Sequence, residues 1–207
     1  MKTKAVCITC LLAAVLCSTP AHAAVILSLE QVGLNVVATA TGTIDLTGLT
    51  PYFSGSVQAF VQADEAILHL GNNVEYDAYM GILGPTSFGS GGDINATSAS
   101  GVPFAIIGSG GSPYIDVPHG FVSGSSISST ATWNNTTLAG LGITSQIYNY
   151  TWGPGTDDSI SFYAGVPVPS SSTPEPAPAL LLILAAAAFA LFRRTSSASF
   201  RHSRITD

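Results

Sequence analysis

The chain has 207 residues, of which 46% are hydrophobic and only 9% are charged, and its formal net charge is −6 at pH 7. This length corresponds to one domain once targeting segments at the two ends are set aside. No Lys or Arg lies between Ala24 and Phe192, so the middle of the chain is anionic, and we expect it not to bind nucleic acid. All three cysteines lie in the first twenty residues, so without that segment the protein has no thiol for a disulfide, a metal site or a nucleophile.

A cleavable signal peptide is predicted at residues 1–23. Two lysines precede an apolar run, and the segment ends in Ala21-His22-Ala23. Signal peptidase accepts small residues at the first and last of these positions, which places the cleavage between Ala23 and Ala24. The Sec translocon and signal peptidase are therefore expected partners, and an uncleaved membrane anchor is the alternative.

The middle of the chain, residues 24–165, is predicted to fold as an all-β domain. Thr alternates with small or branched apolar residues along 36–46, a pattern typical of a half-buried strand. Turns rich in Gly and Asn separate many short segments of this kind, which indicates an antiparallel β-sandwich or jelly-roll. One helical turn is expected at 137–141. The predicted strands cover 25–30, 36–46, 56–60, 66–70, 76–82, 104–107, 114–117, 126–133, 147–152 and 159–163.

Two histidines, His69 and His119, lie between the terminal segments. His69 falls in a predicted strand and His119 in a Pro-His-Gly turn. A Ser-His-Asp site would need one of them beside a serine and a carboxylate. Because no Gly-x-Ser-x-Gly motif occurs, we expect a strand-surface and a loop histidine, and no catalytic residue.

Two acidic pairs invite a metal-binding interpretation. Asp157 and Asp158 follow a Gly-Pro-Gly-Thr loop, and Asp64 precedes Glu65. Neither pair has the spacing of a known calcium loop, so solvated acids, with no metal or cofactor bound, are the expectation. Paired carboxylates also serve glycoside hydrolysis, but the sequence does not single out a pair.

Aromatic residues alternate near the end of the predicted domain. Tyr148, Tyr150 and Trp152 point to one face of a strand. If that face were exposed, the three rings could form a strip that stacks on sugars. We expect instead that they, like Trp133, belong to the core.

The C-terminal region is predicted to be a sorting signal. Its parts are a Pro- and Ser-rich linker at 166–173, a signal segment at 174–194 and a basic cytoplasmic tail at 195–207. The signal segment holds Pro174-Glu175-Pro176, a hydrophobic run of fourteen residues and then Arg193-Arg194. As a helix the run spans about 21 Å, whereas a permanent transmembrane helix needs ~20 residues. We therefore expect transient insertion into the inner membrane, with the arginines on the cytoplasmic side.

The order of linker, Pro174-Glu175-Pro176, short apolar helix and arginine pair resembles the PEP-CTERM sorting signal of Gram-negative bacteria. That resemblance implies that the chain is a substrate of an exosortase, an integral-membrane transpeptidase-like enzyme, with processing near the Pro-Glu-Pro motif. The family is associated with exopolysaccharide and biofilm matrix. Residues 36–49, 84–89 and 148–153 also resemble the N-terminal domains of many such proteins, a group that brings no assigned activity.

These observations predict an exported, non-enzymatic protein of the cell surface or extracellular matrix, structural or associated with exopolysaccharide in a biofilm. Its expected partners are the exosortase, the export machinery, the inner membrane as a transient intermediate, and extracellular polysaccharide. The second hypothesis is a carbohydrate-binding module or adhesin, and the third is a secreted hydrolase.

Overall fold

The computed structural model describes residues 24–153 and 158–169. These residues form two sheets rich in antiparallel pairs, together with one short 3₁₀ turn, η1 (Ala63–Glu65), and no α-helix among them. The all-β prediction is confirmed. The expected terminal helices lie outside the described residues, and within the described part of the chain no helix is long and apolar enough to cross a membrane.

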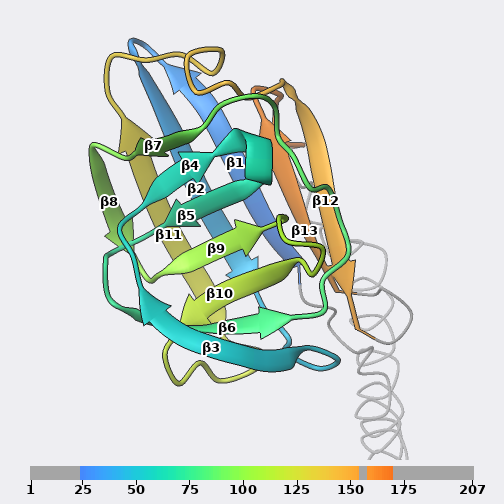
Figure 1. Ribbon diagram of the computed structural model, residues 1–207. Helices are drawn as coiled ribbons and strands as arrows, with labels where there is room; N and C mark the ends of the chain where they lie inside the picture. The colour runs from blue at the N-terminus through green and yellow to red at the C-terminus, as the bar shows by residue number, and fades with distance from the viewer. Residues whose placement is uncertain (1–23, 154–157, 170–207) are drawn as a thin grey trace, which may run out of the picture. The chain divides into compact units, whose positions relative to one another are not determined.

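The strands are β1 (Ala24–Val32), β2 (Asn35–Thr43), β3 (Thr50–Ser56), β4 (Phe60–Gln62), β5 (Ile67–Leu70), β6 (Glu75–Met80), β7 (Asp93–Asn95), β8 (Ser98–Gly101), β9 (Phe104–Ile107), β10 (Tyr114–Pro118), β11 (Ser126–Trp133), β12 (Gln146–Trp152) and β13 (Asp158–Ala164). Sheet A has the order β12-β13-β1-β2-β11-β8, and sheet B has the order β3-β6-β10-β9-β5-β4-β7. Only β1 and β13 pair in parallel among these strands. The two sheets pack face to face in a sandwich-like arrangement, with sheet B in front in Figure 1.

The alternation of residue types along β2 explains how sheet A forms its half of the core. Val36, Ala38 and Ala40 point inward and are fully buried, whereas Thr39 and Thr41 point outward. Successive side chains of a strand face opposite sides of its sheet, so a Thr-apolar repeat gives one polar and one apolar face. One continuous hydrophobic core between the two sheets results.

The aromatic residues near the C-terminal end of the described region belong to that core. Tyr148, Tyr150 and Trp152 are at most 2% exposed, as is Trp133, so the core prediction for all four is confirmed. The hydroxyl of Tyr150 donates to the carbonyl of Pro85 at 2.8 Å, and the indole N–H of Trp152 donates to a backbone carbonyl at 2.7 Å. Their polar ends are thus satisfied, as burial of Tyr and Trp requires.

One predicted strand, at 56–60, is wrong, because it falls on the connection between two strands that the sequence pattern does not predict. The sequence pattern predicts a strand at 56–60, but β3 ends at Ser56 and β4 begins only at Phe60. The chain between them passes from one edge of sheet B to the region near its other edge. This connection brings the aromatic residues of β3 and β4 onto the same sheet.

Candidate functional site

The two described histidines lie in different environments. The side chain of His119, in the turn after β10, is 58% exposed, so the prediction of a loop histidine is confirmed. His69 lies on β5 as predicted, but its side chain is only 7% exposed. The expectation of a strand-surface histidine is therefore wrong, because side chains from other strands cover the outer face of sheet B at this point.

A row of cross-strand partners explains where His69 points. Ala78 of β6, Asp116 of β10, Ala105 of β9 and His69 of β5 lie opposite one another across four adjacent strands, on the outer face of sheet B. Ala105 contributes only a methyl group between the two ionisable side chains. His69 therefore reaches over it, and its Nε2 lies 2.9 Å from Oδ2 of Asp116.

Asp116 is a buried carboxyl group with incomplete pairing. It is 1% exposed, and its Oδ1 accepts no hydrogen bond from any described residue. Burial raises the pKa of Asp116, an effect that His69 opposes. Burial, reinforced by the charge of Asp116, also raises the pKa of Tyr114 to about 12. A buried polar group without a full set of hydrogen-bond partners lowers the stability of the folded state. Packing alone therefore does not explain why an aspartate occupies position 116.

A β-bulge in β3 places two aromatic residues opposite one small one. Pro51 pairs with Tyr79 and Ser54 pairs with Asp77, so two residues of β3 face the single residue Ala78 of β6. Such a two-against-one bulge bends the strand and redirects its side chains. The two residues are Tyr52 and Phe53, which are 56% and 41% exposed.

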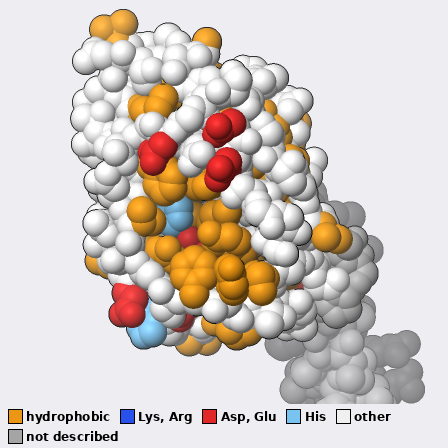
Figure 2. All heavy atoms as spheres, viewed as in Figure 1, with side chains coloured by type: hydrophobic (Ala, Val, Ile, Leu, Met, Phe, Trp, Pro, Cys, Tyr) orange, Lys and Arg blue, Asp and Glu red, His pale blue; other side chains and the backbone are white. Residues whose placement is uncertain are grey.

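We use the name aromatic face for the rings that surround the His69–Asp116 pair. Tyr52 and Phe53 each lie 5.8 Å from Tyr114, centroid to centroid, and Phe53 lies 6.1 Å from Tyr76. His69 stacks on Phe60 at 5.3 Å and lies 5.5 Å from Tyr76. Figure 2 shows hydrophobic side chains gathered around one histidine on this side of the molecule, with acidic side chains beside them. The members of the aromatic face are Tyr52, Phe53, Phe60, Tyr76 and Tyr114.

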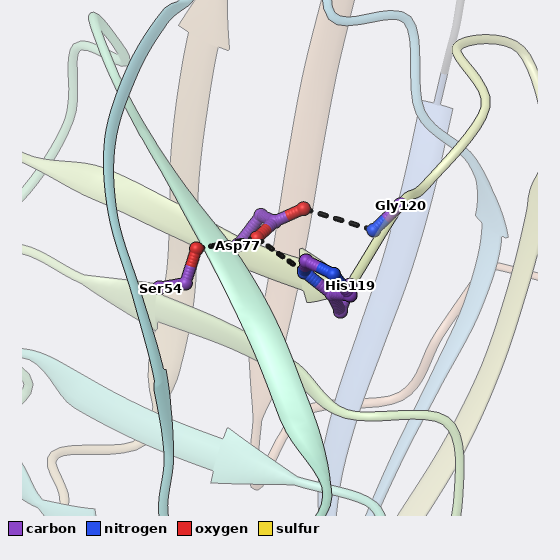
Figure 3. Close-up of polar contacts among 4 residues, drawn as sticks. All are labelled: Ser54, Asp77, His119 and Gly120. Atoms are coloured by element: carbon purple, nitrogen blue, oxygen red, sulfur yellow. Dashed lines mark hydrogen bonds and ion pairs between the residues drawn. The ribbon is translucent and has the colours of Figure 1, made fainter.

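A second polar cluster is centred on Asp77, next to the bulge (Figure 3). Ser54 Oγ donates to Oδ1 of Asp77 at 2.7 Å, His119 Nδ1 lies 2.9 Å from the same oxygen, and the N–H of Gly120 donates to Oδ2 at 2.9 Å. These hydrogen bonds, that from Ser54 first, lower the pKa of Asp77 to about 2. The hydrogen bond and charge of Asp77 in turn raise the pKa of His119.

The order of groups in this cluster differs from that of a nucleophilic triad. In a Ser-His-Asp site the imidazole lies between the hydroxyl and the carboxylate. Here Asp77 lies between Ser54 and His119, and both bind its Oδ1. The cluster joins β3, β6 and the turn after β10, and a pocket of about 330 Å³ opens beside it, lined by residues 51–54 and by strand β6. These contacts tie Ser54, next to the bulge, to β6 and to the turn after β10.

The acidic pairs have separate outcomes. Asp64 and Glu65 are exposed on η1, which confirms the expectation of solvated acids for that pair. Asp157 lies outside the described residues. Asp158 is 6% exposed, so the same expectation is wrong there: it occupies an inward-facing position of β13, in line with Ile160. Within 24–153 and 158–169, no group of three or more metal-ligating side chains gathers.

The residues predicted for export and sorting lie mostly outside the described region. Ala24 is the first residue of β1, while Ala21 and Ala23 lie before it. The sorting motif, Pro174, Glu175, Pro176, Arg193 and Arg194, lies after it.

The sequence pattern does not predict the aromatic face. Its residues come from β3, β4, β6 and β10, which are far apart in the chain and become neighbours only through the strand order of sheet B. Two signals exist in hindsight: the adjacent Tyr52-Phe53 pair, and the carboxylate two residues after Tyr114 on the same side of a strand. Without the strand order of sheet B, neither signal predicts which residues lie beside it.

Comparison of the chain with protein-family models, curated proteins and solved structures finds no match.

Proposed function

We propose that this chain is an exported surface or extracellular-matrix protein with a β-sandwich body and no catalytic role. A signal peptide directs it to the Sec translocon, and signal peptidase cleaves it before Ala24. A PEP-CTERM sorting signal then holds it in the inner membrane, where an exosortase processes it near Pro174-Glu175-Pro176 and passes it to the cell surface or beyond.

The start of the fold supports this proposal. Ala24, the first residue expected after cleavage, already pairs with Ser159 of β13. Val25 is already buried in the core. Cleavage before Ala24 would therefore keep every described residue of β1 in the mature protein.

The composition of residues 24–169 is consistent with an extracellular location. Residues 24–169 contain neither cysteine nor a basic Lys or Arg side chain, so folding needs no disulfide formation. The core consists of packed apolar and aromatic residues whose polar ends are hydrogen-bonded.

The sorting step is tested by deleting residues 174–194 or by replacing Glu175 with Gln, followed by cell fractionation and intact-mass analysis. We expect both changes to leave the protein unprocessed or misrouted. Glu30→Gln, at an exposed position of β1, is the matched control and should be processed normally. Unchanged mass and fractionation of the Glu175→Gln protein and of the deletion would contradict the proposal.

One observation favours a second function, carbohydrate binding. The rings of Tyr52 and Phe53 on sheet B are exposed to solvent and are not part of the hydrophobic core. Exposed Tyr and Phe rings provide apolar contact area, and Tyr adds a hydroxyl group, which suits sugars that are apolar on one side and rich in hydroxyls. We therefore propose that the body attaches the protein to extracellular polysaccharide through the aromatic face.

Glycan arrays probed with the purified protein test this second function. Binding should be lost in the double variant Tyr52→Ala/Phe53→Ala. Absence of binding by the unchanged protein to every glycan would reject it. A hydrolase is the less favoured third candidate, because Ser54 and His119 bind the same oxygen of Asp77 instead of each other.

A further inference from the structure

We propose that the aromatic face binds a polysaccharide that carries protonated amines, such as a partly de-N-acetylated hexosamine polymer. This inference rests on the carbohydrate-binding function proposed above and adds the chemical class of the ligand. Three observations carry it: the angles between the rings, the charge around them, and the incompletely paired carboxyl group beneath them.

The rings at the bulge form an edge-to-face cluster and not a flat platform. The planes of Tyr52 and Phe53 meet at 75°, those of Tyr52 and Tyr114 at 69°, and those of Phe53 and Tyr114 at 71°. A neutral pyranose stacks best on rings that share one plane. The steeply inclined rings offer no such plane, because they pack edge to face on one another, and the exposed rings of Tyr52 and Phe53 remain available to a cation.

The charged groups around the rings are mainly acidic, and His69 is an imidazole that lies among them. Burial raises the pKa of Tyr114, and the charges of Asp116 and Glu65 raise it further, so both carboxyl groups act at the position of this ring. Because no Lys or Arg occurs between residues 24 and 192, nothing basic of that kind offsets these acids. The resulting negative potential favours a cationic ligand and repels an anionic polymer.

Asp116 places a buried carboxyl group on the same side of the sheet as the rings. Its carboxyl group lies in the row between Ala78 and Ala105, two residues along β10 from Tyr114, and its Oδ1 accepts no hydrogen bond from the described residues. A cation held above the rings stabilises a carboxylate in these low-dielectric surroundings more than it would in water. The ligand would therefore add a positive charge to the one partner, His69, that Asp116 has among the described residues.

A second copy of the chain is a poorer occupant of this face. Two copies would bring together surfaces that are both acidic, which costs free energy at close range. A protonated amine on each sugar unit offers charge complementarity, and a polymer repeats it along its length.

The test uses isothermal titration calorimetry of the full chain in mild detergent with two soluble probes, the hexamers of glucosamine and of N-acetylglucosamine. The probes differ only in the amine, which is protonated in the first and acetylated in the second. We expect the full chain to bind the glucosamine hexamer at least about tenfold more tightly, a difference of ~1.4 kcal/mol. Added salt should weaken this binding.

Variants distinguish binding at the aromatic face from the general attraction of an acidic protein for a cation. Tyr52→Ala/Phe53→Ala removes two exposed rings and keeps the net charge, and it should reduce the affinity for the glucosamine hexamer about tenfold. Leu34→Ala/Ile147→Ala, at positions of sheet A and its first turn that are 76% and 49% exposed, is the matched control and should bind like the unchanged protein. Asp116→Asn should weaken binding of the glucosamine hexamer. If the Asp116→Asn variant fails to fold, Glu65→Gln removes a carboxylate at an exposed position and should also weaken this binding.

Each contrary result has its own meaning. Equal affinity for the two hexamers overturns the amine requirement but leaves carbohydrate binding intact. Failure to bind either probe, together with empty glycan arrays, overturns both proposals. Equal loss of affinity in the control double variant, or none in the Tyr52→Ala/Phe53→Ala variant, shows that the aromatic face is not the site. A concentration-dependent dimer that disappears in the Tyr52→Ala/Phe53→Ala variant shows that a second copy occupies the face.

Discussion

His69 and Asp116 form their contact across a strand that separates them. β9 lies between β5 and β10, yet Nε2 of His69 lies 2.9 Å from Oδ2 of Asp116. Strands two places apart are about 10 Å apart in a sheet, so the side chains must lean toward each other over the residue between them. That residue is Ala105, which is fully buried beneath the contact.

The first prediction concerns this small residue. Ala105→Val adds two methyl groups in the space that the His69–Asp116 contact crosses, and we expect a loss of about 1–3 kcal/mol in the free energy of unfolding, typical of overpacking. Denaturant titration measures the change. Ala139→Val, at an exposed position, is the control and should change stability by less than about 0.5 kcal/mol. Equal midpoints for the two variants would show that the contact tolerates a larger neighbour.

The second prediction is the pH dependence that Asp116 contributes. Burial raises the pKa of Asp116 above its ordinary value of 3.8, so the folded state binds this proton more tightly than the unfolded state does. The stabilising contribution is therefore complete below pH 3.8 and is lost as the pH rises through the folded-state pKa. Asp116→Asn cannot ionise, so its stability relative to the unchanged protein should increase with pH over that interval. A stability difference that is constant with pH, in denaturant titrations at a series of pH values, would contradict this.

The inward-facing residues of the sandwich could be predicted from the sequence because they follow local rules. The Thr-apolar alternation at 36–46 corresponds to β2, and the spacing of Tyr148, Tyr150 and Trp152 places all three in the core. The helical turn expected at 137–141 is present as one bond from the N–H of Leu141 to the carbonyl of Thr137, 2.9 Å long. Each of these features depends on neighbours within a few residues.

The features that escaped prediction depend on strand order. β7 and β8 are short edge strands made mainly of Asp, Asn, Ser and Gly, residues of low strand propensity that only pairing with β4 and β11 keeps extended. The burial of His69 likewise depends on Phe60 and Tyr76, which reach it from two other strands. No local sequence pattern predicts that side chains from other strands cover the outer face of sheet B at His69.

The third prediction concerns Asp77, whose pH dependence has the opposite sign. Hydrogen bonds from Ser54, Gly120 and His119 lower the pKa of Asp77 from 3.8 to about 2, so the folded state binds this proton less tightly than the unfolded state does. The contribution is present above pH 3.8 and is lost as the pH falls toward 2. Because the cluster is partly exposed to solvent, we expect Asp77→Asn to cost only about 1 kcal/mol at neutral pH. The cost should shrink in acid, which denaturant titration at several pH values detects.

An independent readout of the same cluster is the titration of His119. The hydrogen bond and charge of Asp77 raise the pKa of His119 above its ordinary value of 6.5, and NMR titration of the ring protons should show this. In the Asp77→Asn variant the pKa of His119 should fall back toward 6.5. A His119 pKa that does not respond to this substitution would mean that the two side chains do not interact in solution.

The fourth prediction compares two glycines that differ in the space around them. A Cβ at Gly84 would lie 2.2 Å from the ring of Tyr150, whereas a Cβ at Gly92 would meet nothing within 4 Å. Tyr150 cannot move aside easily, because its ring is fully buried and its hydroxyl is bound to the carbonyl of Pro85. Neither glycine has the positive φ that strains other residues, so the two substitutions to alanine test the close approach alone.

We expect Gly84→Ala to lower the free energy of unfolding by about 1–3 kcal/mol, since the ring or the backbone must shift to admit the methyl group. Gly92→Ala should be neutral or should stabilise the protein by about 0.4–1 kcal/mol, because it restricts the unfolded chain without a clash in the folded one. Urea titrations of the two variants and the unchanged protein give the comparison directly. If Gly84→Ala is as stable as Gly92→Ala, Tyr150 packs less tightly against residues 84–85 than the structure shows. Strand β12, which carries Tyr150, could then shift to admit the methyl group.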